Sequence, residues 1–460
     1  MLIQLFKNYF LSEKPPGATI ADLNLELDPR VSIETLRTYN FTRNEIIHYS
    51  FLTLVFVFSF SIIPVSFFLV KLPIICLFCL ILLIPFTSQF FLNALPVLAW
   101  VALFFSSPNI SSIHKPAITV KVLPAVETIL YGDNLSQILA TSTNSVLDIL
   151  AWLPYGIIHF SLPFIVAGII FLWGPPTALR SFAFAFGYMN LFGVIIQLLF
   201  PAAPPWYKIL HGLDPANYSM LGSPGGLARI DTLLHVDLYT TNFSKNSPVV
   251  FGAFPSLHSG SATMDALFLT YLFPKFAPLF VFYVTWLWWS TMYLTHHYFI
   301  DVIAGSLLSF VVFLYTKYKH LPVNESRAKN RWSYAEIRKL NLFKMDPLKL
   351  SLDSDVDQGY KPAISGTRTR SSSLHNPANG IEMNFMSRQA QSPVKDLQTE
   401  NTAAPLTAGS SGSISPDASS VFESELPRSI SRSSNTSATS VESQFDLGVA
   451  PSTSNKSRTD

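Results

Sequence analysis

Residues 277–317 read APLFVFYVTWLWWSTMYLTHHYFIDVIAGSLLSFVVFLYTK. The stretch contains two apolar runs, 277–295 and 299–317, and each is long enough to cross a hydrocarbon core of about 30 Å as a helix. Before its final lysine, its only charged side chain is Asp301. The runs are continuous rather than alternating, and a backbone inside a bilayer finds no water. The pattern therefore predicts membrane-spanning helices and not a barrel.

The same pattern recurs along the rest of the chain. Of all residues, 49% are hydrophobic and 13% are charged, whereas about a quarter are charged in a typical soluble protein. We predict an all-α fold, a polytopic transmembrane helical bundle of eight spans, or of six if the region 72–105 folds differently. Besides the two runs above, the predicted spans lie near 51–70, 72–87, 88–105, 154–173, 181–200 and 260–273.

These spans divide the chain into five parts. Composition adds an expectation for the last part, because the sequence from about residue 351 onward is rich in Ser, Thr, Asn and Pro, cannot bury a core and should be disordered. The predicted parts are a cytosolic segment (1–50), N-terminal spans (51–105), a lumenal or interfacial segment (106–150), a catalytic core (151–320) with a lumenal loop (201–255), and a largely disordered cytosolic tail (321–460).

The distribution of basic residues predicts the orientation. Lysine and arginine near span ends collect on the cytosolic side, and both the lead segment and the segment after the last span, which starts with Lys317 and Lys319, are basic. An even number of spans then places both termini in the cytosol and the 201–255 loop in the lumen. Four glycosylation sequons fall on that lumenal side: Asn109, Asn134, Asn217 and Asn242.

A first candidate site lies at Phe254-Pro255-Ser256-Leu257-His258-Ser259-Gly260-Ser261, directly ahead of an apolar helix. Small residues at a helix start, here Ser256, Ser259 and Gly260, leave backbone amides available to an anion such as a phosphate. A histidine at that position, His258, can hand a proton to an oxygen that leaves phosphorus. The alternative is that a serine merely caps the helix and that His258 faces water.

A second candidate site is Tyr293-Leu294-Thr295-His296-His297-Tyr298-Phe299-Ile300-Asp301. His297 and Asp301 are four residues apart, so they share one face of a helix. The carboxylate can accept a hydrogen bond from one ring nitrogen and leave the other nitrogen free as a nucleophile. Metal binding is the rival use of this spacing, but no third ligand has an obvious register. We expect the neighbouring His296 to be an interfacial polar residue.

The two candidate sites form a pair of short sequence motifs, called boxes below, that together resemble a known family. A Pro-Ser-x-His box followed about forty residues later by His-x-x-x-Asp resembles the type 2 phosphatidic acid phosphatase superfamily. The surrounding segments FGYMNLFG (186–193) and FPAAPPWY (200–207) are similar to the fungal inositol phosphorylceramide synthase family, the aureobasidin A resistance proteins. The resemblance covers roughly residues 40–320.

The resemblance implies a role for each residue of the two boxes. His297 would be the nucleophile that takes the phosphoryl group, Asp301 would orient it, and His258 would protonate the leaving oxygen. The enzyme would be a transferase of the Golgi membrane, acting on phosphatidylinositol and ceramide at the lumenal side, with a small regulatory membrane subunit as a further partner. It implies neither a cofactor nor a metal. The sequence contains no basic patch interspersed with aromatic residues, so we do not expect nucleic acid as a partner.

The sequence departs from the phosphatase pattern in its cations. No K-x6-R-P box occurs, and Ser290-Thr291 stand where the superfamily has a Ser-Arg pair. A phosphomonoester carries nearly two charges at neutral pH, whereas a phosphodiester donor carries one and needs fewer cations. Lys208 and Arg229 are candidates to supply them, and Trp206 and Tyr207 are candidates to line the site.

Two other functions stay open. One is a lipid phosphatase or phosphodiesterase that uses water as the acceptor, and the other is a lipid transporter with a proton relay. Three polar residues in predicted spans are expected to serve packing or interhelical hydrogen bonds: His159, Gln197 and Asp265. Cys76 and Cys79 are expected to be small buried hydrophobic residues.

Overall fold

The computed structural model describes residues 1–64 and 68–339. The chain divides into two units, residues 1–383 and 384–460, and every described residue belongs to the first. The predicted disorder from about residue 351 falls outside the described residues. Residues 321–339, which we assigned to the tail, are described and pack against the N-terminal segment. Asn330 donates to the carbonyl of Tyr9 at 3.2 Å, and Arg331 donates to that of Ala21 at 3.2 Å.

The described chain is helical, and its only β-type pairing consists of isolated bridges. The all-α prediction is confirmed. The α-helices are α1 (Leu2–Phe6), α2 (Pro29–Thr38), α3 (Arg43–Ile62), α4 (Phe68–Leu83), α5 (Pro85–Phe91), α6 (Leu95–Ser106), α7 (Val122–Tyr131), α8 (Leu135–Ala140), α9 (Ser145–Trp152), α10 (His159–Trp173), α11 (Ala178–Leu199), α12 (Pro205–His211), α13 (Leu227–Leu234), α14 (Tyr239–Lys245), α15 (Leu257–Leu272), α16 (Ala277–Tyr293) and α17 (Phe299–Lys319).

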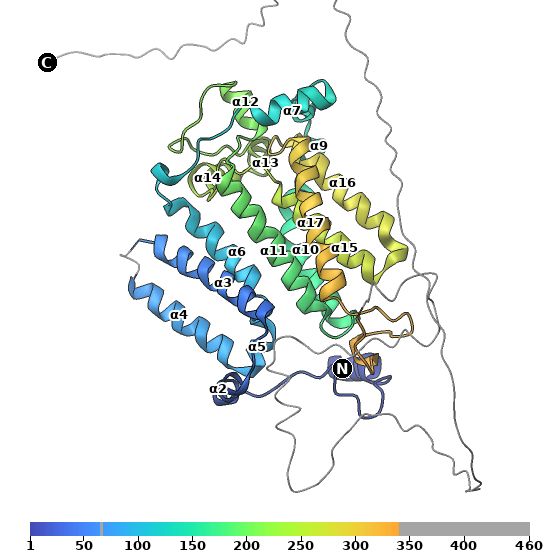
Figure 1. Ribbon diagram of the computed structural model, residues 1–460. Coiled ribbons are helices and arrows are strands. Elements are labelled where there is room, and N and C mark those ends of the chain that lie inside the picture. The colour runs from blue at the N-terminus through green and yellow to red at the C-terminus, as the bar shows by residue number, and fades with distance from the viewer. Residues whose placement is uncertain (65–67, 340–460) are drawn as a thin grey trace, which may run out of the picture. The chain divides into compact units, whose positions relative to one another are not determined.

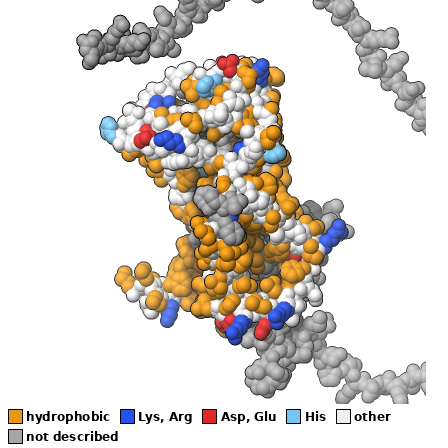
Figure 2. All heavy atoms as spheres, turned by 90° about the vertical axis from the view of Figure 1, so that its left-hand side faces the viewer, with side chains coloured by type: hydrophobic (Ala, Val, Ile, Leu, Met, Phe, Trp, Pro, Cys, Tyr) orange, Lys and Arg blue, Asp and Glu red, His pale blue; other side chains and the backbone are white. Residues whose placement is uncertain are grey.

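Four helical stretches among the described residues are long and apolar enough to cross a membrane: Arg43–Ile62, Ser145–Trp173, Ala178–Leu199 and Phe299–Lys319. A fifth is added if α4 and α5, which are bent by 101° relative to each other, count as one span. This is fewer than the eight expected, because α6, α15 and α16 have only 12, 16 and 17 residues. Figure 2 shows hydrophobic side chains over the middle of the molecule, with charged side chains toward both ends. The chain is a multi-pass membrane protein.

The first span begins at Arg43 rather than near residue 51 because a capping box starts the helix there. The amide of Thr42 donates to the carboxylate of Glu45 at 2.8 Å, and the amide of Glu45 donates to the Thr42 hydroxyl at 3.3 Å. The two contacts satisfy two amides that a helix start leaves without partners. In α4, Cys76 and Cys79 are free thiols exposed on the helix surface, so the expectation that they are buried is wrong.

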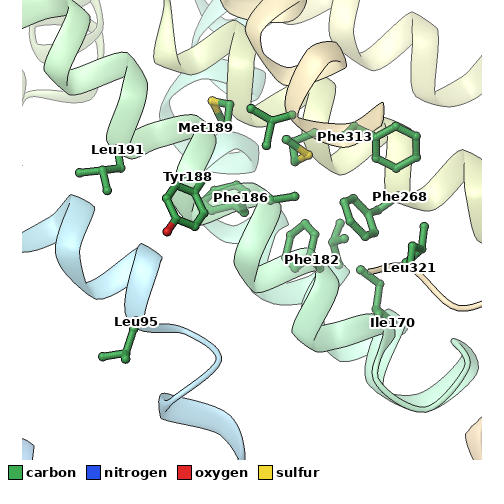
Figure 3. Packing of buried hydrophobic residues seen from close by; sticks show 14 of the residues in the cluster. Leu95, Ile170, Phe182, Phe186, Tyr188, Met189, Leu191, Phe268, Phe313 and Leu321 are labelled. Atoms are coloured by element: carbon green, nitrogen blue, oxygen red, sulfur yellow. The ribbon is translucent and has the colours of Figure 1, made fainter. Parts of the chain in front are cut away.

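Helix α11 lies at the centre of the bundle, between α6 on one side and α15 and α17 on the other (Figure 1). Figure 3 shows the aromatic side chains that fill the space between these helices. The ring of Phe268 on α15 packs edge-on against Phe182 of α11, with centroids 5.1 Å apart, and against Phe313 of α17 at 5.2 Å. Such pairs fix how the helices sit against one another.

Helices α15 and α17 approach closely at two glycines. A methyl group placed on Gly305 of α17 would collide with the carbonyl oxygen of Ser256, and one on Gly260 of α15 would lie 3.3 Å from the carbonyl oxygen of Gly305 and 2.7 Å from the sulfur of Met189 on α11. Small residues at a membrane helix interface allow such close backbone packing. The contact brings the start of α15 beside the start of α17, where the two sequence boxes lie.

Candidate active site

The two boxes meet at the start of α15 and α17. Nδ1 of His258, in the first turn of α15, lies 3.2 Å from Nε2 of His297, which precedes α17. The amide of Ser256 donates to the carbonyl of Asp301 at 3.0 Å, and the Ser256 side chain caps α15 by accepting from the amide of Ser259 at 3.3 Å. These bonds join the two helix starts and hold the imidazoles together.

The hydrogen bond that the other ring nitrogen of His297 makes fixes the tautomer of the ring. Nδ1 lies 3.0 Å from the carbonyl oxygen of Ala253, and a carbonyl can only accept. Nδ1 therefore carries the hydrogen, and Nε2 presents a lone pair toward His258. Ala253 is itself held in place, because its amide donates to the carbonyl of Ala202 at 3.2 Å, and the Ala202 amide donates to that of Phe251 at 2.8 Å.

Asp301 lies beside this pair without bonding directly to it. Its Oδ2 accepts from the amide of Tyr298 at 2.8 Å, and the same oxygen is 3.7 Å from Nδ1 of His297. That distance is too long for a hydrogen bond, so the expected direct bond from His297 to the carboxylate is wrong. The Ala253 carbonyl takes that position, and Asp301 caps the turn that precedes α17.

His297 is almost fully buried. Removal from water disfavours the charged ring and lowers the pKa of His297 to about 4, although its hydrogen bond to the Ala253 carbonyl opposes that shift. The ring is therefore neutral at physiological pH, as a nucleophile must be.

A strained turn presents His297. Thr295, two residues earlier, has a positive φ of 63°, which a β-branched residue rarely adopts. The surroundings hold the turn, since the amide of Trp206 donates to the carbonyl of Thr295 at 3.0 Å and the amide of Gly226 donates to that of Leu294 at 2.9 Å. Gly225 has a φ of 52°, and a methyl group there would lie 2.6 Å from both the Leu294 carbonyl and the Thr295 hydroxyl. Strain of this kind is found where a site is preorganised.

Two aromatic side chains of the Ser145–Trp173 stretch cover His258. A π-helical segment, Leu153–Ile158, joins α9 to α10, and such segments are frequent at functional sites. The ring of Tyr155 stacks on His258 with centroids 4.5 Å apart, and that of His159 lies 4.7 Å away. His159 thus lies at the site, although the sequence analysis assigned this residue to packing or interhelical hydrogen bonds. His296, expected at an interface, is instead buried and is bonded to the Pro224 carbonyl at 3.0 Å.

Glu127 is a residue that sequence reasoning missed. It is fully buried on α7, and its Oε1 accepts from the amides of Phe299, at short range, and Ile300, at 3.3 Å. Glu127 therefore caps α17 from outside, next to Asp301. Burial raises the pKa of Glu127, and the two amide bonds oppose that shift. The sequence signal was weak, because a lone acidic residue 174 positions before Asp301 gives no hint of its partner.

The residues predicted to bind substrate have protein partners instead. The Ser259 hydroxyl donates to the carbonyl of Val302 at 2.6 Å, and Gly260 lies in the helix contact described above. Arg229 is paired with Asp148 at 2.8 Å. Lys208 donates to the side chain of Asn134. Asn134 is buried, so this predicted glycosylation site has no room for a glycan. Trp206 and Tyr207 belong to a buried cluster.

The other two polar residues within predicted spans also have buried positions. Gln197 of α11 donates to the carbonyl of Pro255 at 3.0 Å, so its partner lies in the loop before α15 and not in a helix as expected. Asp265 is buried, and its Oδ1 has no hydrogen-bond partner among the described residues.

A cavity of about 1560 Å³ opens beside the histidine pair. His258, His297 and His159 line one end, and Thr19, Asp22 and Arg331 line the other. Much of the wall between them is apolar and comes from α6, α10 and α11, including Trp100, Phe160, Phe164, Phe182 and Phe186. Among the described residues, none of the seven predicted substrate-binding side chains lines this cavity. As substrate contacts they stay predictions.

Comparison with known proteins agrees with this arrangement. Residues 121–315, which contain both boxes, match the family model of the PAP2 superfamily. The inositol phosphorylceramide synthase of Candida albicans is 57% identical over 403 residues, which cover 86% of this chain and 85% of that protein. The catalytic subunit of the Saccharomyces cerevisiae enzyme is 57% identical over 78% of this chain and 92% of that protein.

The chain belongs to the inositol phosphorylceramide synthase family. A phosphoinositol dihydroceramide synthase from Bacteroides thetaiotaomicron is 30% identical over 36% of this chain and 59% of that protein. No solved structure matches the chain. Members of the inositol phosphorylceramide synthase family are transferases by name, and the family assignment confirms the prediction of a transferase.

Proposed function

We propose that the chain transfers phosphoinositol from phosphatidylinositol to the primary hydroxyl of ceramide, with release of diacylglycerol, through a phosphohistidine on His297. The observation that carries this proposal is the 3.2 Å contact between His258 and His297 at the end of an apolar cavity. The names of the relatives give inositol phosphorylceramide as the product, the resemblance described above suggests phosphatidylinositol as the donor, and the geometry supports the roles of the residues.

In the first step Nε2 of His297 attacks phosphorus. A P–N bond forms, and the bond from phosphorus to the diacylglycerol oxygen breaks. Because Nε2 is an acceptor, the nitrogen of His258 that faces it is a donor. In its imidazolium form His258 is thus placed to give this proton to the departing oxygen, so that His258 becomes a neutral imidazole and the leaving group departs as neutral diacylglycerol.

In the second step ceramide is the nucleophile. His258, now without its proton, accepts the hydrogen of the primary hydroxyl while the oxygen attacks phosphorus. The P–N bond breaks and His297 returns to its neutral form. The apolar wall of the cavity favours this outcome, because it suits lipid chains and excludes the water that would otherwise hydrolyse the phosphohistidine.

The setting of this reaction is part of the proposal. We place the enzyme in the Golgi membrane, with the histidine pair on the lumenal side and both termini in the cytosol. The basic segments around the first and last spans support that orientation. The Saccharomyces cerevisiae relative is named a catalytic subunit, which supports a small regulatory membrane subunit as a partner of this chain.

The test is transfer of label from phosphatidylinositol in the presence and absence of ceramide. We expect His297→Ala and His258→Ala to lower the rate at least ~10²-fold, and His114→Ala, which replaces an exposed histidine of a short 3-10 turn, to leave it unchanged. Label from the phosphate should be trapped on wild-type protein in an acid-labile form and not on His297→Ala. Normal transfer in both site variants would end the proposal, and release of inositol phosphate independent of ceramide would favour the hydrolase.

A further inference from the structure

Two polar side chains interrupt the cavity wall just below the histidine pair. Asn190 on α11 and Ser261 on α15 both line the cavity, and both are almost fully buried, with 1% and 4% of their surfaces exposed. Their neighbours in the wall include Phe186 and Leu257. Polar groups within an apolar membrane protein are costly and usually have a function.

The position of the pair relative to the catalytic histidines follows from the helices. Ser261 lies three residues after His258, so it is one turn further along the same face of α15. Asn190 lies two turns before Gln197 on α11, and Gln197 is bonded to the carbonyl of Pro255 next to the start of α15. A lipid whose hydroxyl reaches His258 would therefore place its next few atoms at Asn190 and Ser261.

The pair retains hydrogen-bonding capacity. The amide nitrogen of Asn190 donates to the carbonyl of Phe186 at 2.9 Å, and its Oδ1 receives only a long contact, 3.4 Å, from the Ser261 hydroxyl. An amide oxygen has two lone pairs, and a hydroxyl oxygen has two as well. Both oxygens can thus accept further hydrogen bonds from a molecule in the cavity.

We propose that Asn190 and Ser261 recognise the acceptor lipid by accepting hydrogen bonds from the groups next to its primary hydroxyl. This inference rests on the proposed function. A ceramide carries an amide N–H and a secondary hydroxyl within a few bonds of the primary hydroxyl, and both are donors. Diacylglycerol carries two esters, which only accept. The two residues are therefore specificity-determining residues that favour ceramide over the diacylglycerol leaving the same site.

The physical basis is that a hydrogen-bond acceptor left without a donor in an apolar site costs free energy. Diacylglycerol in the acceptor position would offer neither oxygen a donor, so that Asn190 would keep only the long contact from Ser261, whereas ceramide would offer a donor to each. A site built to hydrogen-bond a substrate N–H or O–H discriminates strongly against an analogue that lacks it. Such discrimination would also limit the return of diacylglycerol as an acceptor.

The experiment compares two acceptors with one donor. Wild-type enzyme and the variants Asn190→Leu and Ser261→Ala are given phosphatidylinositol with either ceramide or labelled diacylglycerol, whose incorporation reports exchange back into phosphatidylinositol. We expect each variant to lower kcat/KM for ceramide by about 10-fold, the size of one lost hydrogen bond, and not to lower diacylglycerol exchange, because diacylglycerol makes no hydrogen bond that the variants remove. Asn8→Leu is the control, because Asn8 is exposed in the N-terminal segment and does not line the cavity, and it should change neither rate.

Modified acceptors make the assignment specific. Ceramide lacking its secondary hydroxyl, and ceramide methylated on its amide nitrogen, should each react about 10-fold more slowly than ceramide with wild-type enzyme. At least one of these differences should disappear in Asn190→Leu or Ser261→Ala, since the partner is already gone.

The outcomes separate the two proposals. If wild-type enzyme makes inositol phosphorylceramide but the variants keep the full preference for ceramide, the role of Asn190 and Ser261 is wrong and the proposed function stands. If wild-type enzyme neither transfers to ceramide nor exchanges diacylglycerol, the proposed function itself fails. Should Asn190→Leu not fold, Ser261→Ala removes only one oxygen and decides the question alone.

Discussion

Both ring nitrogens of His297 have a partner among the neighbouring residues. Nδ1 bonds to the Ala253 carbonyl, and Nε2 faces His258. Burial keeps the ring neutral, because the charged form would lose its hydration without a bonded carboxylate to replace it. The proposed nucleophile is thus desolvated and bonded to a backbone carbonyl, with the carboxylate of Asp301 at longer range.

The pH dependence of the first step should report this burial. Since the pKa of His297 is lowered to about 4, the ring keeps its lone pair until the pH falls toward that value. We expect the acid limb of kcat/KM for phosphatidylinositol to lie well below pH 6.5, with activity lost as pH falls through about 4 to 5. The measurement is a pH profile of diacylglycerol release with His114→Ala alongside. An acid limb near 6.5 would mean that the ring titrates as if exposed.

The two functions of Asp301 can be separated by substitution. Asp301→Asn keeps an oxygen that can accept from the Tyr298 amide but removes the charge near His297. We expect it to fold normally and to lose activity by about 10- to 100-fold. Asp301→Ala should also lower stability by about 1 kcal/mol, the usual cost of a lost cap. Transfer rate and thermal unfolding are measured together, and an Asp301→Asn enzyme as active as wild type would show that charge has no part.

At the scale of elements, the start of α17 is held from outside by α7. Glu127 accepts from two amides of the first turn of α17, so it positions the segment that carries His297 and Asp301. We expect Glu127→Ala to lower transfer at least 10-fold, whereas Glu127→Gln, which keeps an accepting oxygen, should retain most of the activity. Lys121→Ala, an exposed change just before the same helix, is the control. Equal activity of the Ala and Gln variants would exclude this role.

The contact between α15 and α17 offers a second prediction at this scale. A methyl group on Gly305 would meet the Ser256 carbonyl, whereas one on Gly168 of α10 would meet nothing within 4 Å. We expect Gly305→Ala to separate the helix starts and lower transfer about 100-fold, while Gly168→Ala has no adverse effect. Activity per folded protein, judged by size-exclusion behaviour, is the readout. Full activity of Gly305→Ala would show that the contact can relax without disturbing the histidines.

At the scale of the whole molecule, the two polar ends should face different compartments. Cys76 and Cys79 are free and exposed, so labelling starts from a chain in which both are replaced by serine. A cysteine at exposed His235 should react with an impermeant maleimide only after Golgi-derived vesicles are opened, and one at exposed Lys329 should react in sealed vesicles. Transfer activity of the cysteine-free chain is the control. Reaction of both positions in sealed vesicles would overturn the proposed orientation.

The sequence by itself determined that the chain is a helical membrane protein and that His258, His297 and Asp301 form one candidate site. Long apolar runs and the four-residue spacing of His297 and Asp301 are local properties, so they can be read without knowing which helices touch, whereas the link to His258 came from the resemblance to a family. Helix starts were less certain, as the Thr42–Glu45 capping box shows by placing the first span at Arg43.

Only the tertiary structure decided what surrounds the histidines. The Ala253 carbonyl, Glu127, Tyr155 and His159 reach the site from segments far away in the chain, and no period or spacing encodes such contacts. Trp206, Lys208 and Arg229 do not line the cavity, and each has a protein partner. Buried polar groups must be satisfied by whatever the fold brings near, and that depends on the arrangement of all the helices at once.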